Sequence, residues 1–342
     1  MSDLSQKIKD ANTLVQTDVS GGVADSVEKF AQATTDWILK QDPATTPTPI
    51  PPTPTPTPKL MKYGVCPGAS SHQWSDADHA WYTAAMRDLA QGKPFYVRVI
   101  AGDNAATNRD VDKFNAAGLT TMLVLYGTTG PTAPTAMPKT LAARYKGMKV
   151  IYEGINEPDI NGWTANPLAD FQKAMYGYVK EGDPNALCGS PGLWKGNPNG
   201  YAQWVTFPRA LAARAKGYFD FFATHCGYDD PTITAASAAS WNYYHWNFKK
   251  YGTVAAGGTT EEILAAAGIN VPIMSSEGGG GGTEQNYLDK VTKILNSAKN
   301  GPLASCCVYT IEADVPGYQV LIRPDKSLTP AYNSFKQFMA GV

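Results

Sequence analysis

The sequence of 342 residues has few charged residues, and no block of one sign stands out. Asp, Glu, Lys and Arg make up 17% of the chain, and the formal net charge is −1. Without a cluster of Lys or Arg, the electrostatic footprint of a protein that binds nucleic acid or an anionic membrane is missing. No apolar run approaches the roughly 20 residues that a membrane helix needs. Because 43% of the residues are hydrophobic, we expect a soluble globular protein with a sizeable core and with neither nucleic acid nor a membrane as a partner.

Cysteine is scarce as well, and its spacing carries no motif. The five cysteines are odd in number and show no CxxC or Cys/His pattern, so neither a disulfide framework nor a zinc site is implied. We therefore expect buried free thiols. The first residues, Met-Ser-Asp-Leu-Ser-Gln-Lys, lack the charged and apolar regions of a secretory signal, so a protein acting outside a cell would need another export route. The cysteines are Cys66, Cys188, Cys226, Cys306 and Cys307.

One segment near the N-terminus consists almost entirely of two residue types. Residues 43–58 read PATTPTPIPPTPTPTP, in which fourteen of sixteen positions are Pro or Thr. Such a segment extends as polyproline II and forms a semi-rigid spacer of roughly 50 Å. We therefore divide the chain into a helical arm (1–42), a Pro/Thr-rich linker (43–59) and a main domain (60–342). The arm carries a single apolar stripe, too little to be stable alone, so we expect it to bind a partner protein or to self-associate; the alternative is a frayed leader.

From residue 60 onward, short β-rich runs alternate with helical stretches, which is typical of βα units around a parallel sheet. Eight such runs within roughly 280 residues match a (β/α)8 TIM barrel. An open doubly wound sheet is the competitor, but the turn after the first run, residues 67–71 (PGASS), matches no dinucleotide or phosphate-loop fingerprint. We therefore predict an α/β fold with a TIM barrel. The expected strands are 62–66, 95–100, 120–126, 149–155, 186–190, 219–225, 271–276 and 304–310, and the expected helices lie near 75–91, 109–117, 136–146, 167–182, 200–216, 259–267, 283–299 and 330–340.

Two of the predicted strands end on a glutamate. The fourth runs into residues 152–158 (YEGINEP), and the seventh reaches Glu277 just before five glycines. Catalytic residues of a TIM barrel lie at the carboxyl ends of its strands. The fourth and seventh strands face each other across the mouth, so we expect Glu157 and Glu277 to converge over one bound group. Two opposed carboxylates suit glycoside hydrolysis, in which one donates a proton and the other, ionised, attacks.

These residues also carry a resemblance to a known family. Asn156-Glu157-Pro158, together with a glutamate ending the seventh strand, resembles the signature of the clan A retaining glycoside hydrolases. The run at 153–158 is similar to the Glu-x-x-Asn-Glu-Pro sequence of xylosidase-like and cellulase-like members. The resemblance implies that Glu157 is the acid/base and Glu277 the nucleophile. It covers residues 60–342 and none of the first 58.

The resemblance assigns further side chains to the site. Arg98 stands where the clan keeps an arginine near the nucleophile, and His225 and Tyr228 resemble the His and Tyr that order it. We expect Arg98 and Tyr228 to keep Glu277 ionised, while its negative charge helps to hold a proton on the other glutamate. Asn156 is placed to hydrogen-bond the sugar 2-hydroxyl.

Other acidic and aromatic residues are open to plainer interpretations. Glu153 is predicted to be a structural carboxylate paired inside the barrel. Glu312 is predicted to be a solvated charge in a loop; the alternative is that it lines the cleft after the eighth strand. Many clan members have a tryptophan at the end of the eighth strand, as the floor of the sugar subsite. Here residues 308–312 read VYTIE, so Tyr309 would take that place, and the sugar preference stays open.

Five tryptophans follow the first, fourth, fifth and sixth predicted strands, in loops expected to form the substrate cleft. Sugar rings have apolar faces and polar rims, which suit flat aromatic platforms. We therefore expect several subsites and an oligosaccharide or polysaccharide substrate; the alternative is that these rings support helices from within the core. The five residues are Trp74, Trp163, Trp194, Trp241 and Trp246.

The sequence is thus interpreted as a retaining glycoside hydrolase with a carbohydrate substrate and no metal or cofactor. One alternative is a non-catalytic glycan-binding or structural protein on the same barrel, which the missing tryptophan favours. An aldolase that works through a Schiff base lacks a lysine at any strand end. The order of arm, linker and enzyme resembles virion-attached cell-wall depolymerases and modular secreted cellulases, so an extracellular or virion-associated location is expected.

Overall fold

The computed structural model describes the main domain, and the predicted arm (1–42) and linker (43–59) lie outside the described residues. The description covers residues 60–342 except 69, 103, 128–129, 194–200, 227–259, 280–282, 301–302 and 313–318.

Seven parallel strands form one sheet in the order β4-β3-β2-β1-β7-β6-β5. Each strand lies close to a predicted position. Because the fifth predicted strand is not among these seven, β5, β6 and β7 correspond to the sixth, seventh and eighth predicted strands. The strands are β1 (Tyr63–Gly68), β2 (Phe95–Ile100), β3 (Thr120–Tyr126), β4 (Val150–Ile155), β5 (Phe222–Cys226), β6 (Ile273–Gly279) and β7 (Ser305–Tyr309).

The segment 188–193 joins the two outer strands of this sheet. It forms isolated parallel bridges on one side with Tyr152 and Asn156, and on the other with Phe221 and Thr224. The predicted (β/α)8 barrel is therefore confirmed. The predicted fifth strand at 186–190 takes the form of isolated bridges, which continue past Pro191 to Leu193.

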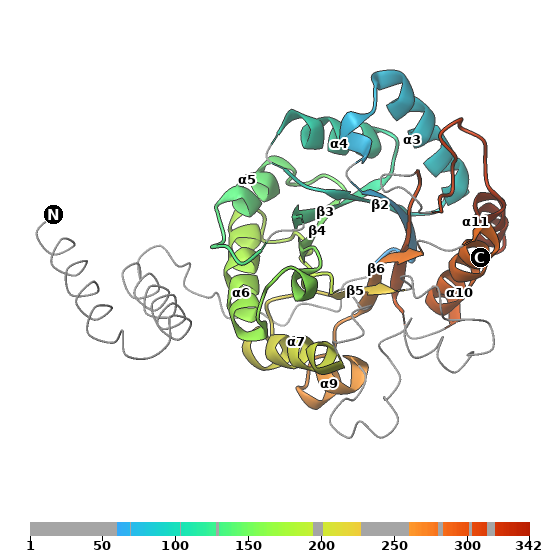
Figure 1. Ribbon diagram of the computed structural model, residues 1–342. Helices are drawn as coiled ribbons and strands as arrows, with labels where there is room; N and C mark the ends of the chain where they lie inside the picture. Colours follow the sequence, from blue (N-terminus) through green and yellow to red (C-terminus); the bar gives the residue numbers. More distant parts are fainter. Residues whose placement is uncertain are drawn as a thin grey trace, which may run out of the picture. The chain divides into compact units, whose positions relative to one another are not determined.

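Helices form a ring around the strands (Figure 1). Most begin and end within a few residues of their predicted bounds. The largest difference is at α4, which begins four residues early because Asn104 Oδ1 accepts a hydrogen bond from Thr107 N at 2.9 Å and caps the helix. The elements are η1 (Ser70–Gln73), α3 (Asp76–Ala90), α4 (Ala105–Ala116), α5 (Met137–Arg144), η2 (Pro158–Ile160), α6 (Ala165–Gly182), α7 (Tyr201–Arg214), α9 (Thr260–Ala266), α10 (Glu284–Asn300) and α11 (Pro330–Ala340).

The hydrophobic core has two parts, one between strands and helices and one inside the barrel. Successive side chains of a strand point to opposite faces of the sheet, so each strand contributes to both parts. The four cysteine side chains that the structure describes are buried thiols, as predicted. The inner cluster consists of Leu60, Tyr96, Met122, Ile151, Phe221, Ala223, Met274 and Cys307.

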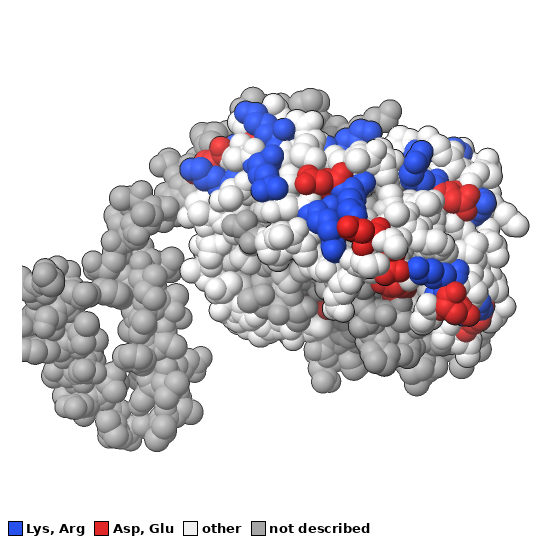
Figure 2. Space-filling view, turned by 90° about the horizontal axis from the view of Figure 1, so that it is seen from above, with Lys and Arg blue, Asp and Glu red and all other residues white. Residues whose placement is uncertain are grey.

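The outer surface mixes charges of both signs. In Figure 2, Lys and Arg side chains lie among Asp and Glu side chains on the face that is drawn. Ion pairs form between charged side chains of the described residues, such as Lys113 with Asp76 at 2.6 Å and Lys326 with Asp78 at 2.7 Å. Among the described residues, no helix is both long and apolar enough to cross a membrane.

We predict that the barrel interior tolerates truncation poorly. Met122 is fully buried in the inner cluster, so Met122→Ala should lower the free energy of unfolding by about 2–5 kcal/mol through lost contacts and a residual cavity. Met148 is 37% exposed, and Met148→Ala should change it by less than about 0.5 kcal/mol. Urea denaturation of both variants measures the difference; equal effects would contradict the described packing.

Candidate active site

A polar layer lies directly above the apolar inner cluster, toward the carboxyl ends of the strands. Side chains alternate between the two faces of a strand, so the residue two positions after an inward-facing residue also faces inward. These next inward-facing residues form the polar layer. Arg98 follows Tyr96 in this way, and the same spacing places Glu153, His225 and Ser276 on β4, β5 and β6. All four of these polar residues are fully buried.

Arg98 is the centre of this layer. Its guanidinium makes a bidentate pair with Glu153, with Nε to Oε2 at 2.7 Å and Nη2 to Oε1 at 2.9 Å. Nη2 also donates to Asn156 Oδ1 at 2.8 Å, and Nη1 donates to Glu277 Oε1 and to Cys66 Sγ, the latter at 3.5 Å. Burial alone would lower the pKa of Arg98, but the charges of Glu153 and Glu277 raise it well above its usual range.

Glu153 is an ionised carboxylate without solvent contact. Burial would raise its pKa, but the charge and hydrogen bonds of Arg98, with a further contribution from His225, lower it to about 2. Ser276 Oγ donates a third hydrogen bond to Glu153 Oε1 at 3.0 Å. The side chain is therefore paired inside the barrel, in the position predicted for a structural carboxylate.

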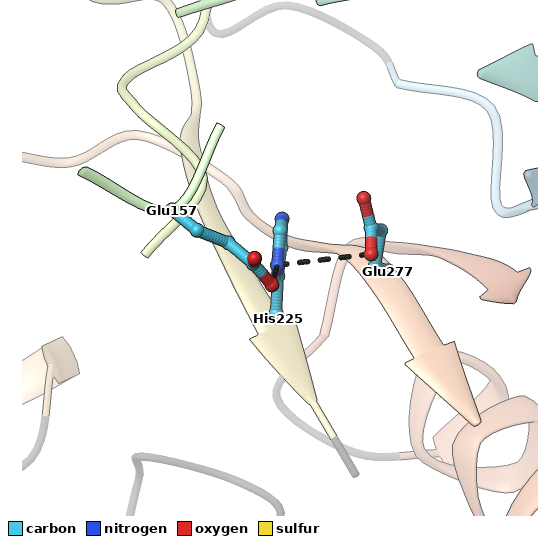
Figure 3. A group of neighbouring side chains, drawn as sticks. All are labelled: Glu157, His225 and Glu277. Atoms are coloured by element: carbon cyan, nitrogen blue, oxygen red, sulfur yellow. Dashed lines mark hydrogen bonds and ion pairs between the residues drawn. The ribbon is translucent and has the colours of Figure 1, made fainter. Parts of the chain in front are cut away.

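His225 lies between the two predicted catalytic glutamates (Figure 3). Its Nδ1 is 2.9 Å from Glu157 Oε1 and 3.9 Å from Glu277 Oε2, and its Nε2 is 3.8 Å from Glu153 Oε1. Burial would lower the pKa of His225, but the charge of Glu277 and the hydrogen bonds to Glu153 and Glu157 raise it to about 10. The carboxylates around the ring therefore favour its charged form, and Nδ1 is within hydrogen-bond distance of Glu157.

Glu157 follows β4 in a left-handed backbone conformation, with φ 48° and ψ 48°. A non-glycine residue in this region is uncommon and persists only where its surroundings hold it. Here Glu157 N donates to Gly192 O at 2.9 Å, and Asn161 Nδ2 donates to Glu157 O at 2.6 Å. These bonds turn the chain so that the Glu157 side chain reaches His225, with 17% of its surface exposed.

Glu277 reaches the same cluster through an irregularity in β6. The register of β6 shifts against both of its neighbours close to this residue. Ser276 and Glu277 are adjacent in sequence, yet both contact the polar layer, Ser276 through Glu153 and Glu277 through Arg98. A bulge re-aims a side chain in this way, and no local sequence signal indicated it.

Gly192 allows the bridging segment to approach the cluster closely. A Cβ at this position would lie 2.6 Å from His225 Nε2 and would also collide with Glu153 Oε1. Gly192 N donates a hydrogen bond to Ile155 O, and Gly192 O accepts one from Glu157 N. Sequence analysis missed this glycine, because its importance depends on strands far away in the sequence.

The carboxylate and imidazole ligand atoms of Glu157, His225 and Glu277 lie within 4.8 Å of one another. This is the one such group among the described residues, and its spacing would admit a metal ion. The charges of Arg98 and His225 oppose the binding of a metal ion. Arg98 is already paired with Glu277, and a metal ion would have to displace a proton from the His225 ring, whose pKa is raised. We therefore treat the cluster as an acid–base site.

Two of the predicted sugar platforms are packed within the core. Trp74 is 5% exposed and stacks on Tyr82 with ring centroids 4.4 Å apart. Trp163 is also 5% exposed and contacts the ring of Phe171 edge-on at 4.9 Å. Tyr309 ends β7 and is 8% exposed. Four other predicted site residues lie outside the described residues: Trp194, Tyr228, Trp241 and Trp246.

The prediction for Glu312 is wrong. It was expected to be a solvated loop charge, but its Oε1 accepts a hydrogen bond from Trp74 Nε1, and it is also bonded to the Tyr82 hydroxyl. The partners are more than 200 residues apart, so only the closure of the barrel brings them together.

Comparison with known proteins gives a likeness in structure alone. No family model matches the chain, and no curated protein matches its sequence. A β-glucuronidase from Bifidobacterium dentium is 11% identical to this chain, with a TM-score of 0.55. The match covers 83% of this chain and 47% of the β-glucuronidase chain. The chain has the barrel fold of glycoside hydrolases. A β-galactosidase from Halorubrum lacusprofundi is 12% identical to this chain, with a TM-score of 0.54. The match covers 82% of this chain and 58% of the β-galactosidase chain.

A smaller barrel enzyme matches along nearly its whole length. The endo-β-1,3-glucanase from Sorangium cellulosum is 14% identical with a TM-score of 0.50, covering 80% of this chain and 97% of its own. The chain therefore corresponds to part of the first two proteins and to almost all of the glucanase. These comparisons confirm the TIM-barrel fold that the resemblance implied.

We predict that Gly192→Ala disturbs the polar layer, because the added methyl group would displace His225 or Glu153. Thermal denaturation should show a Tm several degrees lower, corresponding to about 1–3 kcal/mol of overpacking. Gly341→Ala is the matched control, since its Cβ would meet nothing closer than 3.6 Å, and its Tm should stay close to that of the wild type. An unchanged Tm for Gly192→Ala would contradict the close approach.

Proposed function

We propose that this protein is a retaining glycoside hydrolase that cleaves O-glycosidic bonds of an oligosaccharide or polysaccharide. The observation that carries the proposal is the meeting of Glu157 and Glu277 at the carboxyl ends of two strands that are not neighbours. One carboxylate oxygen of Glu157 lies within 4.8 Å of one carboxylate oxygen of Glu277. Retaining enzymes hold their two carboxyl groups about 5–5.5 Å apart, whereas inverting enzymes need ~6.5–9.5 Å to admit a water molecule. The short separation supports the retaining mechanism.

In the first step, Glu157 gives its proton to the glycosidic oxygen while Glu277 attacks the anomeric carbon. The bond from that carbon to the leaving oxygen breaks, and an ester bond to Glu277 forms. Arg98 supports this role, because its Nη1 donates to Glu277 and keeps the attacking carboxylate ionised and oriented.

In the second step, a water molecule attacks the anomeric carbon from the side that the leaving group vacated. Glu157, now ionised, takes a proton from that water, and the ester bond to Glu277 breaks. Two inversions at one carbon retain its configuration. The sugar is released, and both glutamates return to their starting states.

The charges of the cluster balance throughout this cycle. Before the reaction, the cations Arg98 and His225 face the anions Glu153 and Glu277, and Glu157 holds a proton. After the first step, Glu277 is an ester and Glu157 is the second anion, so the net charge of the cluster is unchanged. His225 Nδ1 lies within 4 Å of both glutamates, so one buried cation can stabilise whichever of them is ionised without reorganising the site.

Asn156 is suited to bind the sugar that reacts. Its Oδ1 accepts a hydrogen bond from Arg98 Nη2 at 2.8 Å, which fixes the amide and leaves the Nδ2 hydrogens for the oxygen of a sugar 2-hydroxyl. Such a bond strengthens in the transition state and contributes to catalysis in glycosidases. The side chain is 7% exposed, at the edge of the buried layer.

The place of action is a further part of the proposal. We propose that the barrel acts outside a cell or on a virion, displayed by the Pro/Thr-rich linker (43–59), while the arm (1–42) binds a partner or itself. The support is the composition of these two segments.

Two isosteric substitutions test the mechanism on a panel of cell-wall and plant glycans. Glu157→Gln should reduce kcat by about 10²–10⁴-fold through loss of the general acid, less with aryl glycosides whose leaving group needs no proton. Azide should then rescue it and yield a glycosyl azide of retained configuration. Glu277→Gln should be inactive with every substrate, because it cannot form the ester.

Glu181→Gln serves as the control, since Glu181 pairs with Lys139 at 3.0 Å on the surface and should turn over like the wild type. Turnover at the wild-type rate by either active-site variant, or a product of inverted configuration by NMR, would refute the assignment. Glycan binding without release of reducing ends would instead favour the non-catalytic alternative.

A further inference from the structure

Two positive groups meet inside the barrel. Arg98 Nη2 and His225 Nε2 lie only 3.4 Å apart, and both side chains are fully buried. Like charges at this distance repel strongly where water is excluded. The contact therefore requires a shared anion, or else the imidazole must be neutral and accept a hydrogen bond from the arginine.

Glu153 is that shared anion. Its Oε1 is 2.9 Å from Arg98 Nη2 and 3.8 Å from His225 Nε2, so a single oxygen contacts both facing nitrogens. Two further donors fix this carboxylate, since Arg98 Nε donates to Oε2 and the Ser276 hydroxyl donates to Oε1.

The two cations turn their other nitrogens toward the catalytic glutamates. Arg98 Nη1 donates to Glu277, and His225 Nδ1 lies 2.9 Å from Glu157 Oε1. Glu153 lies on the opposite side of both cations. Each cation is therefore held between Glu153 and one catalytic glutamate.

We propose that Glu153 is the positioning residue of this site, which fixes Arg98 and His225 together as a pair of cations and so orients and balances the two catalytic glutamates. This inference rests on the proposed function for its catalytic meaning. It goes further than the structural role that the sequence indicated, because it makes the charge of His225 depend on a residue that no substrate touches.

The surroundings of His225 support this dependence. The ring faces three carboxylates, from Glu153 and Glu157 in and after β4 and from Glu277 on β6, and one cation, Arg98 on β2. With Glu157 holding a proton, the loss of Glu153 leaves Glu277 as the one anion of these three carboxyl groups that faces the two cations in a buried space. The ring should then lose its proton more easily and accept a hydrogen bond from Arg98.

The test uses the full-length protein labelled with ¹⁵N-histidine, with Glu153→Gln as the main variant. The chain has four histidines, and His225→Gln assigns the signal of interest. In the wild type both ring nitrogens of His225 should be protonated at pH 7. In Glu153→Gln the ring should become neutral at a lower pH, and the basic limb of the kcat/KM profile should move to lower pH with it.

The same substitution should lower kcat by about 100-fold with little change in KM, because the catalytic glutamates shift while the sugar contacts remain. Asp110→Asn is a matched control: Asp110 is also a buried carboxylate beside a histidine, with His79 Nε2 at 3.3 Å. It should leave the His225 spectrum and the pH profile unchanged, whatever it does to stability.

If Glu153→Gln does not fold, Glu153→Asp keeps the charge on a shorter side chain, and it should keep the His225 ring protonated with a reduced kcat. A neutral His225 ring in the wild type at pH 7, a neutral ring in Glu153→Asp, or an unaltered ring and pH profile in Glu153→Gln would each overturn the inference. Wild-type protein that hydrolyses no glycan would refute the proposed function alone, since the NMR measurement still decides the role of Glu153.

Discussion

The buried ion pair between Arg98 and Glu153 is the interaction on which the carboxyl end of this barrel depends. Placing both charges out of contact with water costs several kcal/mol for each ion, so the geometry must satisfy nearly every donor and acceptor. Arg98 does so by distributing its N–H groups over Glu153, Asn156, Glu277 and Cys66. A guanidinium is suited to this because its planar fork of donors has fixed directions. The pair therefore determines where the neighbouring polar groups can lie.

The layered interior makes this arrangement possible. Apolar side chains such as Met122 and Met274 fill the barrel below the charges and exclude water from that side. In such surroundings the electrostatic interactions of the cluster are stronger than they would be in water, and they are already in place before any substrate binds. One strand serves both purposes, since Ile151 and Glu153 are successive inward residues of β4.

Both candidate catalytic residues stand where the backbone departs from regular geometry. Glu157 has a left-handed conformation directly after β4, and Glu277 lies in an irregular stretch of β6. Regular strands would direct alternate side chains to opposite faces of the sheet, so these departures bring additional side chains to one point. The hydrogen bonds from Asn161 and to Gly192 O hold the Glu157 backbone in that conformation.

The sequence by itself determined the alternation of strands and helices, and with it the barrel, because apolar runs and helix caps are local signals. It also indicated that Glu157 and Glu277 end strands on opposite sides of the barrel. Tertiary structure decided that His225 lies between them, that Trp74 and Trp163 are packed in the core, and that Glu312 is paired rather than solvated. It also reduced the fifth strand to isolated bridges around Pro191. These outcomes depend on register, bulges and barrel closure, which relate residues far apart in the chain and therefore leave no trace in any single segment.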